Sequence, residues 1–136
     1  MERQLLARGM GASPGMATGK IVFRSEEAVA LAADGTSVIL VRIETTSEDV
    51  PGMRAAAGIV TTRGGITGDA AIVARSLGKP CIASCPPMRV DYAKDLLTVW
   101  RDSAGEQSDI VLRRGDEITI DGAKGEIWID SPSPTA

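Results

Sequence analysis

The chain has 136 residues, a formal net charge of −3 with both signs scattered along it, and few large rings: one Phe, one Tyr and two Trp. This length favours a single domain with one hydrophobic core. The charge and the shortage of rings exclude a basic, base-stacking nucleic-acid surface, and no apolar run is long enough to span a membrane as a helix.

The first third of the chain predicts a turn, a strand and a short helix. The turn is expected at Gly11–Gly15, where glycine and proline predominate. Lys20–Phe23 is an apolar run of strand length, and Ser25–Ala33 is rich in Ala and Glu, which favours a helix.

Strand and helix patterns alternate through the middle of the chain. We predict strands at Val38–Arg42, Ile59–Thr62 and Cys81–Ser84, and helices at Val50–Ala57 and Asp69–Leu77. Gly58 and Gly78 stand where glycine commonly ends a helix. This spacing is that of two βαβ units, so it predicts parallel strand pairing and a covered sheet.

Two threonines compete as the start of the first of these central helices. Glu48 follows Thr45 by three residues, and Asp49 follows Thr46 by three. Both pairs fit the capping-box pattern, in which the threonine and the acid each bond the other's backbone. The sequence leaves the two starts open.

The last third of the chain changes to β-like runs separated by polar turns. The predicted strands are Leu96–Trp100, Ile110–Leu112, Glu117–Ile120 and Glu126–Ile129. Asp121–Gly125 is a natural hairpin connection between the last two. We therefore expect one α/β domain over residues 1–130, with a βαβαβ core and a β-rich, barrel-like C-terminal half. Ser131–Ala136 is rich in Ser and Pro and is predicted to be a disordered tail.

The segment Thr61–Ala71 contains the clearest candidate site. A predicted strand end, two glycines and a helix start would bring free N–H groups and the positive helix end together, which favours an anion such as phosphate. The candidate anion-binding residues are Arg63, Gly64, Gly65, Thr67 and Gly68. The same residues are also typical of an ordinary strand-to-helix turn. Neither a G-x-G-x-x-G fingerprint nor a P-loop is present to decide between the two.

The two cysteines, Cys81 and Cys85, do not indicate a metal site. They are four residues apart, and the chain has no His and no further Cys that could complete a zinc site. We expect two buried or half-buried thiols in a reducing cytoplasm, with a short disulfide as the open alternative.

A family resemblance covers nearly the whole chain. Its residues are Gly11–Gly15, Ala17–Gly19, Val38–Arg42, Glu44, Thr45, Glu48–Val50, Gly52, Met53, Ala55–Val60, Arg63–Gly65, Thr67, Ala70–Arg75, Gly78–Cys81, Leu112–Gly122, Gly125 and Glu126. These segments strongly resemble the phosphohistidine domain of pyruvate phosphate dikinase. The chain is thereby identified as a member of the wider phosphoenolpyruvate (PEP)-utilising group, which includes PEP synthases and Enzyme I of the sugar phosphotransferase system.

The resemblance implies a swivelling β/β/α fold and a carrier role. In the family, a histidine in a stretch like R-G-G-M-T-S-H-A-A accepts a phosphoryl group at a nucleotide-binding domain. The domain then swings to a separate PEP/pyruvate barrel. ATP and Mg²⁺ belong to the partner domains, so no cofactor is expected in this one. The chain is too short to hold that barrel, which alone takes about 250 residues.

This chain departs from the family pattern at the carrier position. Alignment on Arg63–Thr67 places Gly68 at the family's serine and Asp69 at its catalytic histidine, and the chain contains no His. Thr67 corresponds to the regulatory phosphorylation site of plant dikinases. A carboxylate repels incoming phosphate, whereas an Asp that caps a helix contributes about 1 kcal/mol of stability. We therefore interpret Asp69 as a helix cap.

Three hypotheses follow for the function. The first is a non-phosphorylatable binding or regulatory module, or the equivalent domain of a larger dikinase-like protein, that is not catalytic alone. The second is a divergent phosphotransferase domain that uses Asp69, or another residue, as the carrier. The third is a small-anion binding module built on the Gly64-Gly65 turn.

Overall fold

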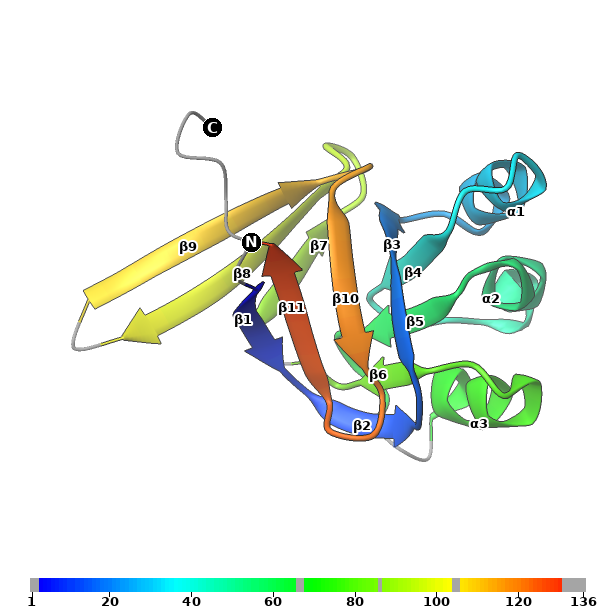
Figure 1. Ribbon diagram of the computed structural model, residues 1–136, viewed down its shortest axis with the longest axis horizontal. Coiled ribbons are helices and arrows are strands. Elements are labelled where there is room, and N and C mark those ends of the chain that lie inside the picture. Colours follow the sequence, from blue (N-terminus) through cyan, green and yellow to red (C-terminus); the bar gives the residue numbers. More distant parts are fainter. Residues whose placement is uncertain (1–2, 66–67, 86, 104–105, 131–136) are drawn as a thin grey trace.

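Strands and helices alternate in the middle of the chain, strands alone occupy its two ends, and the described helices lie on one side of the molecule (Figure 1). The computed structural model describes residues 3–65, 68–85, 87–103 and 106–130. The strands are β1 (Arg3–Arg8), β2 (Met10–Ser13), β3 (Met16–Val22), β4 (Val38–Arg42), β5 (Gly58–Thr61), β6 (Cys81–Ala83), β7 (Met88–Asp91), β8 (Leu96–Ser103), β9 (Glu106–Arg113), β10 (Glu117–Asp121) and β11 (Glu126–Asp130). The helices are α1 (Ser25–Ala33), α2 (Val50–Ala55) and α3 (Asp69–Leu77), and a 3₁₀ helix, η1 (Ser47–Asp49), leads into α2.

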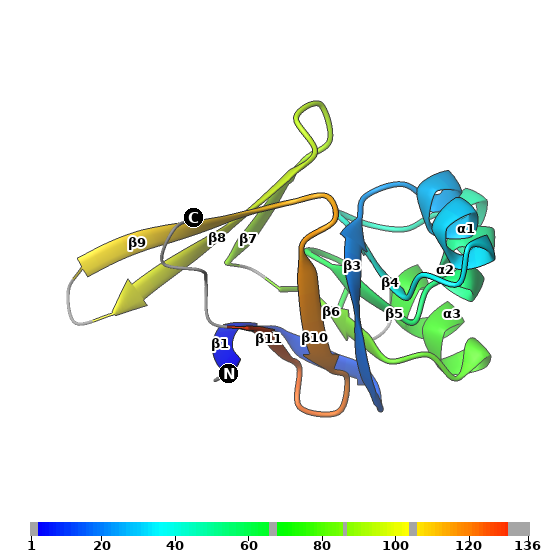
Figure 2. The same cartoon turned by 45° about the horizontal axis from the view of Figure 1, so that its top comes forward.

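The predicted βαβ units are confirmed. β3, β4, β5 and β6 are successive parallel neighbours in an eight-stranded sheet with the order β1-β11-β10-β3-β4-β5-β6-β2. α1, α2 and α3 connect these strands and cover one face of the sheet (Figures 1 and 2). Because parallel strands end at the same edge, the chain segments that follow β3, β4 and β5 lie together there.

Two hydrophobic clusters fill the two faces of the sheet. Along β4, Val38 and Leu40 belong to the cluster under the helices, while Ile39 and Val41 belong to the cluster on the opposite face. This alternation follows from the two-residue period of a strand. Several buried alanines join the helix-side cluster: Ala28, Ala70, Ala71 and Ala74 of the helices, and Ala56 directly after α2. Their small side chains let the helices lie close to the sheet.

Several predicted boundaries differ from the observed ones, and in two of these cases pairing across the sheet outweighs local turn residues. In the predicted turn Gly11–Gly15, Gly11 is instead part of β2 and pairs with Ile82 of β6. The helix predicted over Val50–Ala57 ends at Ala55, and Gly58 starts β5 by pairing with Ile39.

The C-terminal half is rich in strands, as expected, but a barrel-like form for it is not confirmed. β7, β8 and β9 form a separate antiparallel sheet, whereas β10 and β11 belong to the large one. The predicted hairpin between β10 and β11 is present, with Thr119 opposite Trp128 and Asp121 opposite Glu126. The predicted disordered tail, Ser131–Ala136, lies outside the described residues.

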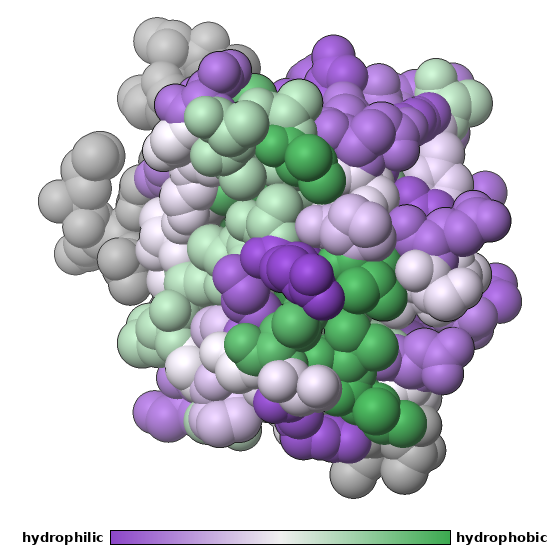
Figure 3. All heavy atoms as spheres, turned by 90° about the vertical axis from the view of Figure 1, so that its right-hand side faces the viewer, coloured by the Kyte–Doolittle hydropathy of each residue, from purple (hydrophilic) through white to green (hydrophobic). Residues whose placement is uncertain are grey.

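Apolar side chains also reach the surface on the helix side of the molecule (Figure 3). Val29 of α1 is 43% exposed and Ile72 of α3 is 52% exposed. Within the described ranges, none of the helices has the length and apolar character needed to cross a membrane.

Candidate functional site

Gly64 and Gly65, which follow β5, have the turn conformation that the sequence predicts for them. Gly64 and Gly65 have φ values of +108° and +61°, a region of backbone conformation that favours glycine. The Gly68 N–H donates to the Gly65 carbonyl oxygen at 3.2 Å, and α3 begins at the next residue. The predicted strand end, turn and helix start are therefore adjacent. Ile66 and Thr67 lie outside the described residues, and with them the expectations for Thr67.

Asp69 is the first residue of α3 and is exposed, but it is not the N-cap. The N-cap position belongs to Gly68, which has no side chain to bond the helix backbone. This corrects the predicted capping role. Asp69 lies in the first helical turn, where its charge complements the helix dipole by about 0.3–1 kcal/mol at an exposed position. No hydrogen bond or ion pair joins its carboxylate to another described residue.

Gly68 is required by a close approach within the turn. A Cβ atom at this position would lie 2.5 Å from the Gly64 carbonyl oxygen and 2.9 Å from its carbonyl carbon. Both atoms belong to the backbone, so the turn would have to open to admit any larger residue. The serine that the resemblance places here does not fit this conformation.

Most of the N–H groups in the described part of the loop are already used inside the protein. The N–H groups of Thr62 and Arg63 donate to the carbonyl oxygens of Arg42 and Ile43, at 3.2 and 3.1 Å. The Gly65 N–H donates to the Ser84 hydroxyl at 2.7 Å. The predicted anion cradle therefore consists mainly of the first N–H groups of α3, which have no partner within a helix, and of the exposed Arg63.

A hollow of about 240 Å³ lies against this turn. It is lined by Glu44, Thr45, Arg63, Gly64, Gly65, Gly68, Asp69 and Ala70. Two acidic residues and one basic residue thus line the hollow, and this balance of charge opposes the binding of a phosphate. Among the predicted anion-binding residues, the structure brings Arg63, Gly64, Gly65 and Gly68 together with Asp69.

Thr45 is a residue of this hollow that the sequence did not assign to it. It is only 6% exposed, and its hydroxyl oxygen has no hydrogen-bond partner among the described residues. The sequence offered Thr45 as one of two alternative caps. The capping box belongs to Thr46 instead: its N–H donates to Asp49 at 2.9 Å, and its hydroxyl accepts the Glu48 N–H at 3.3 Å. Thr45 also lines an apolar hollow of about 270 Å³, with Val50, Asp69 and Ile72.

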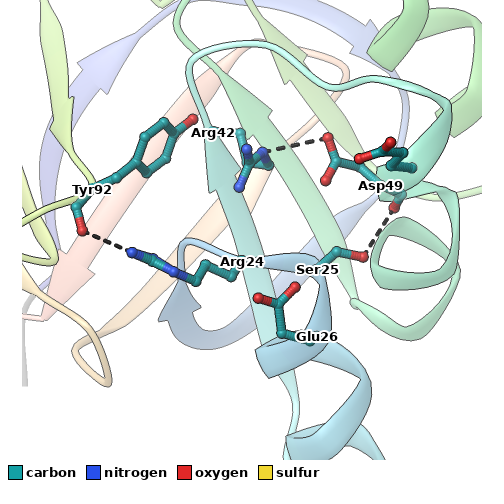
Figure 4. A pocket seen from close by; sticks show the side chains of 7 residues that line it. Arg24, Ser25, Glu26, Arg42, Asp49 and Tyr92 are labelled. Carbon is teal, nitrogen blue, oxygen red and sulfur yellow. Dashed lines mark hydrogen bonds and ion pairs between the residues drawn. The ribbon is translucent and has the colours of Figure 1, made fainter.

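A third hollow, of about 360 Å³, lies where β3 and β4 end (Figure 4). Arg42 crosses it, with its Nε 3.4 Å from Asp49 and its guanidinium 4.8 Å from the centre of the Tyr92 ring. Arg24 donates to the Tyr92 carbonyl oxygen at 3.0 Å and lies 3.6 Å from Asp95. Both arginines are therefore occupied by the protein itself, and the network ties β4 and η1 to the β7–β8 turn.

The cysteines have neither a metal-binding nor a nucleophilic arrangement. Cys81 and Cys85 are free and buried, so the disulfide alternative is not borne out. Burial raises the pKa of each thiol to about 12, which keeps both protonated near neutral pH. Over the described ranges, no three His, Cys, Asp or Glu residues gather closely enough to hold a metal ion.

Comparison with known proteins gives a consistent set of relatives. The family model described as "PEP-utilising enzyme, mobile domain" matches residues 34–125. The chain is 49% identical over 125 residues to pyruvate, phosphate dikinase of Rhizobium meliloti (strain 1021). It is 48% identical over 124 residues to pyruvate, phosphate dikinase 2 of Oryza sativa subsp. japonica, and 45% identical over 124 to pyruvate, phosphate dikinase 1, chloroplastic, of Arabidopsis thaliana. These matches cover 92%, 91% and 91% of this chain but only 13%, 13% and 12% of the relatives.

Proposed function

Because the chain belongs to the family of PEP-utilising enzyme mobile domains, we propose that it is a swivelling domain that cannot carry a phosphoryl group and acts by binding partner domains. One observation carries this proposal: the exposed first residue of α3 is Asp69, at the position where the resemblance places the phosphoryl-accepting histidine. The chain contains no His that could take over the role.

The chemistry of the site supports the loss of phosphoryl transfer. Imidazole is neutral and nucleophilic near pH 7, whereas the Asp69 carboxylate is anionic and shares its hollow with Glu44. Both negative charges repel an incoming phosphate. The buried, protonated thiols of Cys81 and Cys85 are poor substitutes as nucleophiles.

The partners that this proposal requires lie outside the chain. The chain spans about an eighth of the length of the curated relatives it matches, since the alignments cover 12–13% of them. We propose that it meets a nucleotide-binding domain and a PEP/pyruvate barrel, in a larger dikinase-like protein or as separate chains. ATP and Mg²⁺ would be bound by those partners.

The exposure of Asp69 favours one alternative, an acyl-phosphate carrier. Its carboxylate is accessible and has no described partner to neutralise it. The first N–H groups of α3 and Arg63 likewise favour the small-anion module. Both alternatives must overcome the two carboxylates of the hollow and the internal use of the Gly65 N–H.

Intact mass spectrometry tests the proposal directly. The chain is incubated with the nucleotide-binding part of a dikinase relative, ATP and Mg²⁺, and separately with the PEP-binding part and PEP. We expect no mass change in either reaction. A stoichiometric phosphoryl adduct would overturn the proposal. Hydroxylamine lability and loss of the adduct in Asp69→Asn would then assign the adduct to an acyl phosphate at this residue.

Asp69→His is the matched positive control. If only the carrier group is missing, this variant gains one phosphoryl group in the same reactions. Gly68 stays unchanged, because a serine there would collide with the Gly64 backbone. A folded Asp69→His chain that still accepts nothing would mean that the docking surfaces for these partners have changed as well.

A further inference from the structure

Ser84 makes a contact that no local sequence pattern predicts. It follows the last residue of β6, and its hydroxyl oxygen accepts the N–H of Gly65 at 2.7 Å. The two residues are 19 positions apart in the chain, so the contact exists only because β5 and β6 are parallel neighbours that end at the same edge.

The backbone of Ser84 is in a conformation that serine rarely adopts. Its φ is +52°, in the left-handed region where a Cβ atom meets the backbone. Among the described residues that are not glycine, only Asp95 shares this property. Such a conformation persists only where surrounding contacts hold it.

Ser84 and its neighbour Cys85 are bonded to the end of β5 and to the loop that follows it. The left-handed turn sends the chain back toward β5, so that the N–H of Cys85 donates to the Thr61 carbonyl oxygen at 3.1 Å. The Ser84 hydroxyl reaches the loop after β5, where it accepts the Gly65 N–H. Thr61 and Gly65 bracket the start of the turn that leads to Gly68 and Asp69.

We infer that Ser84 is the positioning residue of this loop: its hydroxyl fixes the Gly65 N–H and thereby the place where α3 and Asp69 begin. The same bond occupies an N–H that the loop would otherwise offer to an anion. This inference goes beyond the proposed function and does not depend on whether residue 69 carries a phosphoryl group.

Three substitutions separate the hydroxyl from the backbone conformation. Ser84→Gly removes the acceptor but suits the left-handed backbone, so it keeps the fold. Ser84→Ala removes the acceptor and keeps the strain. Ser84→Asn supplies a side-chain oxygen on a residue that tolerates the left-handed region.

Amide hydrogen exchange in the full chain, resolved by NMR, provides the test. We expect the Gly65 amide to exchange roughly tenfold faster in Ser84→Gly and Ser84→Ala than in the parent chain, and the Gly68 and Asp69 amide signals to shift with it. Ser84→Asn should restore slow exchange. The Cys85 amide, bonded to Thr61, is the internal reference and should stay protected in Ser84→Gly.

Two results would overturn the inference. One is unchanged exchange at Gly65 in a folded Ser84→Gly chain. The other is exchange in Ser84→Asn as fast as in Ser84→Gly, which would mean that an acceptor at position 84 does not hold the loop. Neither result bears on phosphorylation, so this inference and the proposed function can fail independently.

Discussion

Thr45 and Thr61 are both buried close to the site, but their hydroxyls differ in hydrogen bonding. Thr61 is fully buried, and its hydroxyl donates to the Arg63 carbonyl oxygen at 2.8 Å. Thr45 is 6% exposed, and its hydroxyl has no partner in the described part of the chain. A buried polar atom without a partner costs about 1–3 kcal/mol. The unpaired Thr45 hydroxyl therefore lowers the free energy of unfolding of the parent chain.

We predict that Thr45→Val raises the free energy of unfolding by about 1 kcal/mol, because valine has the same shape and no unpaired hydroxyl. Thr61→Val, the matched control, should lower it by about 1 kcal/mol, because the Arg63 carbonyl oxygen loses its donor. Urea unfolding of both variants measures the difference. An equal loss of stability in the two would show that the Thr45 hydroxyl is bonded after all, for example to a buried water.

The site was only partly predictable from its residues. The Gly64-Gly65 turn and the helix start were predictable because glycine and the helix pattern act locally. The Ser84 contact was not, because it depends on how β5 and β6 align across the sheet. The N-cap was assigned to Asp69, one residue too late. Gly68 takes that position with an extended backbone (φ −74°, ψ 168°) and no side chain.

α1 and α2 meet at a contact between Ser25 and Gly52. The Gly52 N–H donates to the Ser25 hydroxyl at 2.8 Å. A Cβ atom on Gly52 would lie 2.3 Å from that hydroxyl and 2.6 Å from the Ser25 Cα. Because the Cα cannot move without its helix, any side chain at position 52 would push α1 and α2 apart.

Gly52→Ala is therefore predicted to lower the free energy of unfolding by about 2 kcal/mol. In an open helix the same change would raise stability by up to about 1 kcal/mol, so the sign is diagnostic. Thermal and urea unfolding measure it. Ser25→Ala is the control, since it removes the hydrogen bond without adding a methyl group and should cost only about 1 kcal/mol. A stabilised Gly52→Ala chain would refute the close contact.

Elements differed in how far the sequence specified them. β4 and β5 were predictable as short apolar runs buried on both faces, which is typical of parallel strands. β1, β2 and β7 were missed. β2 reads Met-Gly-Ala-Ser, with little intrinsic preference for a strand, and its pairing partner β6 lies about 70 residues further along the chain. Such strands form because they pair with a strand that is distant in the sequence. A local sequence pattern does not predict that pairing.

Both edge strands of the large sheet, β1 and β2, come from the same N-terminal segment. β1 pairs with β11 at one end of the strand order and β2 pairs with β6 at the other, with only Gly9 between them. The chain thus covers two edges that would otherwise present unpaired backbone groups. The arrangement also holds β6, from whose end Ser84 reaches the site loop.

The turn between β10 and β11 packs against this N-terminal segment through glycines. The Gly9 N–H donates to the Gly125 carbonyl oxygen, and the Gly122 N–H donates to that of Gly15, both at 2.8 Å. A Cβ atom on Gly122 would lie 1.9 Å from the Ser13 carbonyl oxygen. The backbone of the β10–β11 turn is thus in direct contact with the backbone at the end of β2.

We predict that Gly122→Ala lowers the free energy of unfolding by about 3 kcal/mol, at the upper end of what overpacking costs, because two backbone segments must separate. Gly115→Ala is the control: its φ of +95° imposes backbone strain, but a Cβ there meets nothing within 4 Å, so it should cost only about 1–2 kcal/mol.

Urea unfolding gives the two free energies of unfolding, and amide hydrogen exchange shows which strands are destabilised. In Gly122→Ala, amides of β2 and β6 should lose more protection than those of β4 and β5, because the edge pairing opens before the parallel centre does. Equal losses throughout the sheet would mean that the N-terminal segment does not close it independently, and the distinction between edge and centre would have to be abandoned.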